Sequence, residues 1–172
     1  MRKQQRGFSL IELLIVVAII LIIAAIAIPN LLRAKIAANE SSGAASVRTL
    51  VTANIEYSTS YPASGFATNL AQLGPGAGNT ACATTGPTSS AACIVDAVLA
   101  TGNKSGYGLT SVGQGTLPYQ GFLIAATPVT AGTSGVKGFC AQEDGVVRWV
   151  TPSATSLTTY GSSGCGGLTA LQ

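Results

Sequence analysis

The sequence contains no histidine and very few charged side chains. Only 9% of its 172 residues are charged, and the acidic residues number six. Without an imidazole, the chain lacks the usual group for activating a nucleophile or carrying a proton. Its four cysteines show no C-x-x-C spacing, which argues against a zinc site or a thioredoxin-like motif. We therefore expect no enzymatic activity, no bound metal and no cofactor.

A calcium site is also not expected. Glu143 and Asp144 are the only adjacent acids, and calcium needs six to eight oxygen ligands. The Asp144-Gly145 dipeptide instead indicates a solvated hairpin turn.

The excess of positive charge lies almost entirely at the N-terminus. The formal net charge is +3, but Arg2, Lys3 and Arg6 belong to the first seven residues, and the remainder carries six basic and six acidic side chains. A near-neutral chain predicts no specific nucleic-acid partner. A short basic leader before an apolar segment places the N-terminus in the cytoplasm.

One long apolar run dominates the sequence. It extends from Gly7 to Pro29, GFSLIELLIVVAIILIIAAIAIP, and Leu13 to Ile28 contains no polar side chain. Its length of about 20 residues is enough to cross a bilayer as a helix. A carboxylate near the start of such a run, here Glu12, is costly in lipid and indicates a function.

The run resembles the N-terminus of type IV pilins and of their relatives, the type II secretion pseudopilins. The resemblance is carried by GFSLIELL from Gly7 to Leu14, by the aliphatic run and by Pro29-Asn30. It implies that a prepilin peptidase cleaves after Gly7, that Phe8 becomes the N-methylated first residue, and that Glu12 takes part in docking of subunits in a fibre.

Simple geometry supports that role for Glu12. After cleavage, Phe8 would carry a free amine, and Glu12 lies one helical turn away on about the same face. The carboxylate could then reach the amine of its own chain or of a neighbour. Because an unpaired buried charge costs several kcal/mol, wrongly staggered neighbours would be penalised. We therefore predict that Glu12 sets the register of assembly.

Two other interpretations of the run stay open. It could be a secretory signal peptide cleaved after Ala25-Ile26-Ala27, although it is longer than a usual signal and contains a glutamate. It could also be a signal anchor in which Glu12 snorkels to the interface. The first residue of the mature protein would be Phe8, Ile28 or Met1 in the three cases.

The segment after the run predicts a continued helix. Apolar residues recur at three- and four-residue spacing between Val47 and Ile55, which is the amphipathic pattern. Pro29 predicts a kink or local melting, and the polar stretch Asn39–Gly43 predicts a weak, flexible patch. Tyr61-Pro62 should end the helix.

The second half of the chain predicts short elements around a sheet. We expect one helical turn at Leu70–Leu73, and a helix over Ser90–Leu99 that Ser89 or Ser90 caps, with an apolar face of Ile94, Val98 and Leu99 and a stop at Gly102. Strands are expected at Tyr107–Val112, Gln120–Val129, Gly138–Gln142 and Val146–Val150. Such a meander would cover the helix stripe at Val47–Ile55.

These patterns predict an α+β fold, with a long N-terminal helix and a C-terminal antiparallel β-sheet, as in the pilin-like fold. The expected segments are a leader at 1–7, a transmembrane or filament-core helix at 8–29, its amphipathic continuation at 30–61, a variable loop with a short helix at 62–104, the sheet at 105–151 and a Ser/Thr/Gly-rich tail at 152–172.

The even number of cysteines suggests two disulfides, for which three connectivities are possible. We favour Cys82–Cys93, which would close a short loop, and Cys140–Cys165, which would tie the tail to the sheet. The second pair resembles the disulfide that holds the C-terminal region of many type IV pilins. Free, buried cysteines are the alternative.

The resemblance implies a structural subunit of a type IV pilus, with adhesion, twitching motility or DNA uptake as its roles. Expected partners are other copies in a helical filament, the prepilin peptidase, and the assembly platform with its ATPase. The precursor would span the bacterial inner membrane once before moving to the cell surface. A type II secretion pseudopilin or minor pilin is the alternative, and a membrane-anchored enzyme or binding module is a third, less favoured class.

Overall fold

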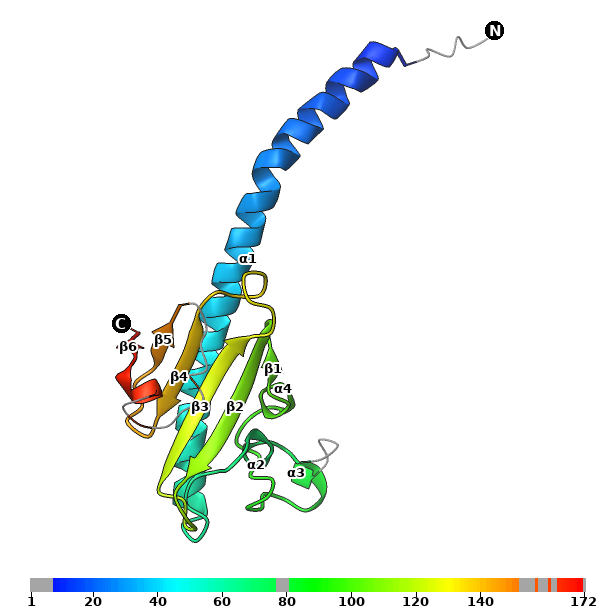
Figure 1. The fold of residues 1–172 in the computed structure, drawn as a ribbon. Helices are drawn as coiled ribbons and strands as arrows, with labels where there is room; N and C mark the ends of the chain where they lie inside the picture. Colours follow the sequence, from blue (N-terminus) through cyan, green and yellow to red (C-terminus); the bar gives the residue numbers. More distant parts are fainter. Residues whose placement is uncertain (1–7, 77–80, 152–156, 158–160, 162–163, 172) are drawn as a thin grey trace. The chain divides into compact units, whose positions relative to one another are not determined.

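The computed structural model describes residues 8–76, 81–151, 157, 161 and 164–171. Gly7, the expected cleavage site, lies outside these residues. The chain divides into two compact units, Met1–Lys35 and Ile36–Gln172, and each is considered by itself. Helix α1, Leu10–Ser60, begins in the first unit and ends in the second (Figure 1).

The described part of the first unit is almost entirely helical. Its residues are mostly Leu, Ile, Val and Ala, and the helix continues without a break through Pro29. The expectation of local melting at Pro29 is therefore wrong for this structure. A proline removes only one backbone donor, and the alanines and leucines on either side favour the helix. A bend at Pro29 stays a prediction.

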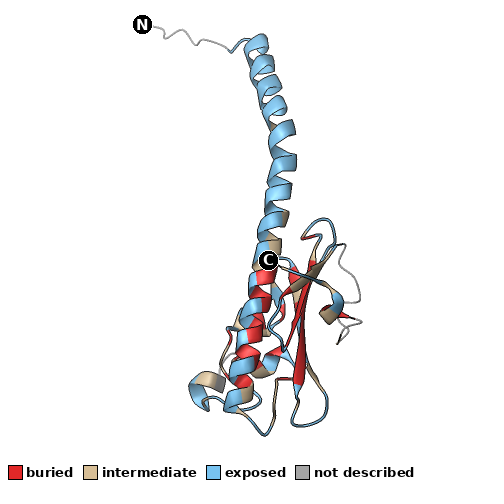
Figure 2. Cartoon of the chain, turned by 90° about the vertical axis from the view of Figure 1, so that its left-hand side faces the viewer, coloured by how far each residue is buried: buried red, intermediate tan, exposed pale blue. Residues whose placement is uncertain are grey.

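The second unit contains a six-stranded antiparallel sheet in sequence order, with the later part of α1 lying along it (Figures 1 and 2). The strands are β1 (Asn103–Lys104), β2 (Tyr107–Gln114), β3 (Gly121–Pro128), β4 (Gly138–Gln142), β5 (Arg148–Val150) and β6 (Thr169–Ala170). The α+β fold predicted from the sequence is thus confirmed. The short edge strands β1 and β6 were not predicted, because two residues carry no alternation pattern.

The core of the second unit forms between α1 and the sheet. Val47, Leu50 and Tyr57 of α1 are fully or almost fully buried, and Ile124 and Phe139 cover them from β3 and β4. Ile55 was predicted to belong to this stripe, but its side chain is 46% exposed. It follows the buried Asn54 and is therefore turned by about 100° around the helix, away from the sheet.

The polar stretch Asn39–Gly43 is anchored, contrary to the predicted flexible patch. Glu40 accepts hydrogen bonds from the backbone N–H groups of Val136 and Lys137 at 3.0 and 3.1 Å. Its other oxygen lies 3.8 Å from Lys137 Nζ. Asn39 Nδ2 donates to the carbonyl of Ser134 at 2.9 Å. These residues therefore fasten α1 to the loop between β3 and β4.

Gly43 has a packing role in the same stretch. A Cβ atom at this position would lie 3.1 Å from Cδ1 of the Tyr107 ring. That ring is fully buried beside Phe139, and its hydroxyl donates to the carbonyl of Lys137 at 2.7 Å. Glycine therefore allows α1 to approach β2 closely, which explains a residue that otherwise weakens a helix.

The described residues before the sheet include the short helices α2 (Leu70–Leu73), α3 (Ala81–Thr84) and α4 (Ala97–Ala100). The helical turn at Leu70–Leu73 agrees with the prediction, whereas the prediction of a helix over Ser90–Leu99 was wrong. Cys93 has a φ of 62°, which a right-handed helix excludes. Asp96 caps the true start, and Val98, expected on the apolar face, is 50% exposed.

The last predicted strand is shorter than expected, because a turn takes up its first residues. Gly145, with a φ of 72°, donates to the carbonyl of Gln142. Asp144 accepts from the backbone N–H of Val146 at 3.1 Å and pairs with Arg148 at 2.5 Å. The Asp-Gly turn is therefore present, and β5 begins only at Arg148.

Candidate functional site

The start of α1 contains a specific cap. Ser9 stands directly before the first helical residue, Leu10, and its backbone N–H donates to Glu12 Oε2 at 2.9 Å. Leu13 donates its backbone N–H to the carbonyl of Ser9. A glutamate at the third helical position that reaches back to the N-cap backbone is one half of a capping box. Glu12 therefore stabilises the end of its own helix.

The capping contact was missed in the sequence, although the signal was present. Ser9-Leu10-Ile11-Glu12 matches the Ser-x-x-Glu pattern that precedes an apolar run. The contact holds the Glu12 carboxylate at the N-terminal end of α1, near Phe8, which is 81% exposed. The geometry brings Glu12 and Phe8 to the same helix end, as expected from their spacing.

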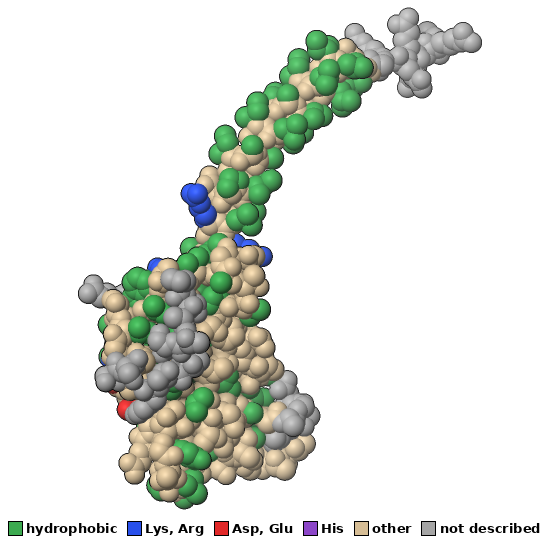
Figure 3. Space-filling view, in the orientation of Figure 1, with side chains coloured by type: hydrophobic (Ala, Val, Ile, Leu, Met, Phe, Trp, Pro, Cys, Tyr) green, Lys and Arg blue, Asp and Glu red, His purple; other side chains and the backbone are tan. Residues whose placement is uncertain are grey.

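The apolar part of α1 is exposed on all sides. Its large aliphatic side chains from Leu10 to Leu32 are between 45% and 75% exposed, and the face shown in Figure 3 is covered with hydrophobic side chains along this segment. Covering one such side chain is worth about 1.5–3 kcal/mol. This surface therefore requires an apolar environment, either lipid or other helices.

Within the described residues, α1 is the one helix long and apolar enough to span a membrane. The polar residues between Phe8 and Pro29 are Ser9, directly before the helix, and Glu12 in its first turn. Basic side chains return at Arg33 and Lys35, as is usual at the end of an apolar span. The segment thus fits both a bilayer and a bundle of like helices.

The structure pairs Cys82 with Cys93 and Cys140 with Cys165, the pairing favoured above. Cys140 in β4 and Cys165 in the 3₁₀ helix η3 (Cys165–Gly167) are both fully buried. They pack with Leu157, which is buried as well. The second bond therefore joins η3 to β4.

Two electrostatic environments stand out in the second unit. Burial raises the pKa of Tyr107 to about 12, and the nearby carboxylate of Glu40 adds to this effect. The hydrogen bond from Arg148 lowers the pKa of Asp144 below its ordinary value. The carboxylates of Glu40 and Asp144 each contact a cation and at least one backbone N–H group, which suits structural contacts better than proton transfer.

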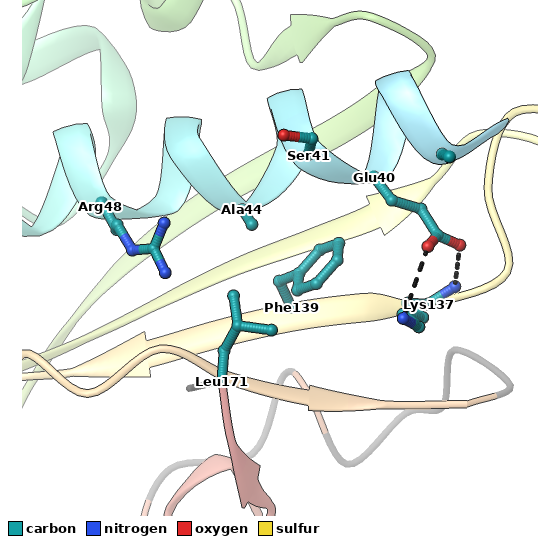
Figure 4. A pocket seen from close by; sticks show the side chains of 8 residues that line it. Glu40, Ser41, Ala44, Arg48, Lys137, Phe139 and Leu171 are labelled. Carbon is teal, nitrogen blue, oxygen red and sulfur yellow. Dashed lines mark hydrogen bonds and ion pairs between the residues drawn. The ribbon is translucent and has the colours of Figure 1, made fainter. Parts of the chain in front are cut away.

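No cluster of three or more His, Cys, Asp or Glu residues suited to a metal occurs in the described part of the chain. A shallow hollow of about 420 Å³ lies between α1 and β4 (Figure 4). Its carboxylate, Glu40, is already bonded to the backbone and to Lys137. This hollow therefore offers no free base, and the chemistry of the site resides in the N-terminal segment.

Comparison with known proteins also points to the N-terminal segment. Residues 2–28 match the family model described as the prokaryotic N-terminal methylation motif. The match includes Gly7, Phe8 and Glu12, and it ends just before Pro29. No solved structure matches the chain.

Two curated relatives share the same region. The chain is 59% identical over 39 residues to the type IV wide pilus major component PilA4 of Thermus thermophilus, which is 23% of this chain and 30% of that protein. It is 50% identical over 50 residues to the type IV major pilin protein PilA of Myxococcus xanthus, 29% of this chain and 23% of that protein. The matches therefore span less than a third of either relative. The similarity to type IV pilins is therefore shown for the N-terminal segment of the chain.

Proposed function

We propose that the chain is a structural subunit of a type IV pilus filament. It is made as a single-span precursor with its N-terminus in the cytoplasm. The prepilin peptidase cleaves after Gly7 and Phe8 is N-methylated. The mature chain then polymerises through its apolar helix, with the assembly platform and its ATPase as partners. The second unit forms the exposed surface of the fibre.

The observation that carries this proposal is the apolar surface of α1. Seventeen large hydrophobic side chains between Phe8 and Leu32 are exposed in the single chain. In the precursor, lipid covers them. Because lipid is as apolar as the side chains, packing and polar pairing, rather than burial alone, drive the transfer from membrane to fibre.

Glu12 supplies the polar pairing in this proposal. In the precursor its carboxylate accepts from Ser9 at 2.9 Å. Cleavage then creates a free amine on Phe8, one helical turn away. In a bundle of α1 helices, the carboxylate of one copy neutralises the amine of a neighbour only at the correct stagger. A wrong stagger leaves a charge unpaired in an apolar core.

The names of both relatives designate major pilins, and a major subunit is the form of the proposal that we favour. Deletion of the coding sequence should remove long surface filaments without impairing protein secretion. Mass spectrometry of sheared filaments from the unmodified strain should identify this chain as their main component. A secretion defect with intact filaments would instead indicate a pseudopilin, and trace abundance would indicate a minor pilin.

A further inference from the structure

Two charged side chains on α1 of the second unit have no ion-pair or hydrogen-bond partner in the part of the chain that the structure describes. Arg48 and Glu56 are both exposed. Among the described residues, neither the Arg48 guanidinium nor the Glu56 carboxylate forms an ion pair or a hydrogen bond, although their backbone carbonyls accept from Thr52 and Thr59. By contrast, Glu40 pairs with Lys137 and Asp144 pairs with Arg148. In the second unit, α1 therefore carries one cation and one anion whose side chains have no partner among the described residues.

Each of the two charges lines a separate hollow. Arg48 lines the hollow of about 420 Å³ shown in Figure 4, beside Ala44, Phe139 and Leu171. This hollow also contains Glu40 and Lys137, so its net charge is positive. The second hollow, of about 290 Å³, contains Glu56 as its only charged group among the described residues.

The lining of the second hollow is otherwise uncharged. It consists of Thr49, Thr52 and Ala53 of α1, with Ile94 and Val95 from the segment before α4. Both hollows thus combine small or apolar side chains with a charge at the helix surface. They differ in sign, which makes one surface complementary to the other.

The spacing of Arg48 and Glu56 along α1 sets the displacement at which they would pair between two parallel copies. Eight residues separate Arg48 from Glu56, which is about 12 Å along the helix. A second copy that lies parallel to the first and is displaced by this distance brings its Glu56 level with Arg48. In such a contact, the Arg48 surface of one copy meets the Glu56 surface of the other. Each of the two copies therefore keeps one of its two surfaces free. Heterologous contacts of this kind extend into open filaments instead of closed dimers.

We propose that Arg48 of one copy pairs with Glu56 of a neighbouring copy in the filament. The proposal rests on the proposed function, since it needs copies packed with parallel α1 helices. It concerns the second unit and is independent of the pairing of Glu12. A subunit in a helical filament has several neighbours at different staggers, so the two contacts involve different neighbours.

A charge-swap experiment in the full-length chain tests the pairing. Arg48→Glu and Glu56→Arg, made singly, should each lower the yield of sheared filaments roughly threefold or more, because two like charges then face each other. The double variant restores the pair with its order reversed and should recover the yield. Lys104→Glu, a charge reversal in β1 at a residue that lines neither hollow, is the matched control and should assemble normally.

Cross-linking provides a readout that does not depend on yield. In a chain with Arg48→Cys and Glu56→Cys, the two thiols lie too far apart to bond within one copy. Oxidised filaments should therefore give a ladder of covalent multimers on non-reducing gels. A chain with Arg48→Cys and Thr49→Cys should give no comparable ladder, because Thr49 is not level with Arg48 at the proposed displacement.

The results separate this inference from the function on which it rests. Normal yields from both single reversals, failure of the double variant to recover, or absence of the ladder in intact filaments would overturn the Arg48–Glu56 contact alone. Absence of the unmodified chain from surface filaments would overturn the proposed function and this contact with it.

Discussion

At the scale of the residue, the proposal assigns the carboxylate of Glu12 two partners at two stages. In the single chain it caps α1 by accepting the backbone N–H of Ser9. In the proposed filament it also neutralises the amine of Phe8 on a neighbour. The first contact needs only an acceptor atom, whereas the second needs a negative charge. Substitutions that separate acceptor from charge can therefore distinguish the two roles.

We predict that Glu12→Val and Glu12→Gln both insert into the membrane normally and both assemble poorly, with a loss of tenfold or more in sheared filaments, which corresponds to about 1.4 kcal/mol. Glutamine preserves the capping acceptor but not the charge. Total cell protein and sheared protein are compared by quantitative immunoblotting. Normal assembly of Glu12→Gln with defective Glu12→Val would show that capping, not charge, is what the fibre needs.

The buried hydroxyl of Tyr107 predicts sensitivity to alkaline pH. Its pKa in the folded chain is raised to about 12, above the ordinary value near 10. The folded state thus binds the proton more tightly, and its contribution of about 2–3 kcal/mol is complete below pH 10 and lost as the pH rises towards 12.

Denaturant unfolding of the detergent-solubilised protein between pH 9 and pH 12 measures this effect. Tyr107→Phe should flatten the pH dependence. Burial also raises the pKa of Tyr57, so Tyr57→Phe is the control. This variant should retain the part of the pH dependence of unfolding that is due to Tyr107. An unchanged slope in Tyr107→Phe would contradict the assignment.

At the scale of the element, the sequence pattern was sufficient to predict helices and strands whose hydrophobic periodicity extends over many residues. The apolar run, the helix end before Pro62 and the strands at β2, β3 and β4 were predicted close to their observed positions. The burial of Val47 and Leu50 followed from the three- and four-residue spacing. These features depend on local pattern, which is what a sequence displays directly.

The errors arose where a distant contact decides the local structure. Asn39–Gly43 was predicted to be flexible because its own composition is polar, but the partners of Glu40 lie nearly 100 residues away in the β3–β4 loop. The helix predicted at Ser90 conflicts with the positive φ of Cys93, a position tied to Cys82 by a disulfide. Neither constraint can be read from neighbouring residues.

Close packing at Gly43 yields a prediction for α1. Gly43→Ala should destabilise the second unit by about 1 kcal/mol, because the strain of overpacking against Tyr107 exceeds the gain in helix propensity. The ring cannot easily move, since its hydroxyl is bonded to Lys137. Thermal unfolding followed by circular dichroism measures the change. Adding Tyr107→Leu should relieve the strain, and a stabilised Gly43→Ala protein would contradict the proposed contact.

At the scale of the whole molecule, the two disulfides are expected to differ in importance. Cys140–Cys165 encloses a loop with a sequence separation of 25, and both cysteines are fully buried. Cys82–Cys93 has a separation of 11 and lies in the segment before the sheet. Loop-closure entropy gives about 3 kcal/mol for loops of this order and increases with loop length.

We therefore predict that Cys140→Ala/Cys165→Ala lowers the stability of the second unit by roughly 3 kcal/mol or more. The matched pair Cys82→Ala/Cys93→Ala should cost less, because its loop is shorter and neither of its cysteines lies in a strand of the sheet. Denaturant unfolding compares the two variants. Equal losses, or a larger loss for the Cys82–Cys93 pair, would contradict the greater contribution of Cys140–Cys165 to stability.

The account as a whole depends on a processed helix that begins at Phe8 and packs with other copies. Mass spectrometry of the N-terminal peptide from sheared surface filaments tests this claim most directly. The account predicts a single mature form that begins with N-methylated Phe8, without residues 1–7. A filament protein that begins at Met1, or a surface protein that begins at Ile28 after loss of the apolar run, would contradict it.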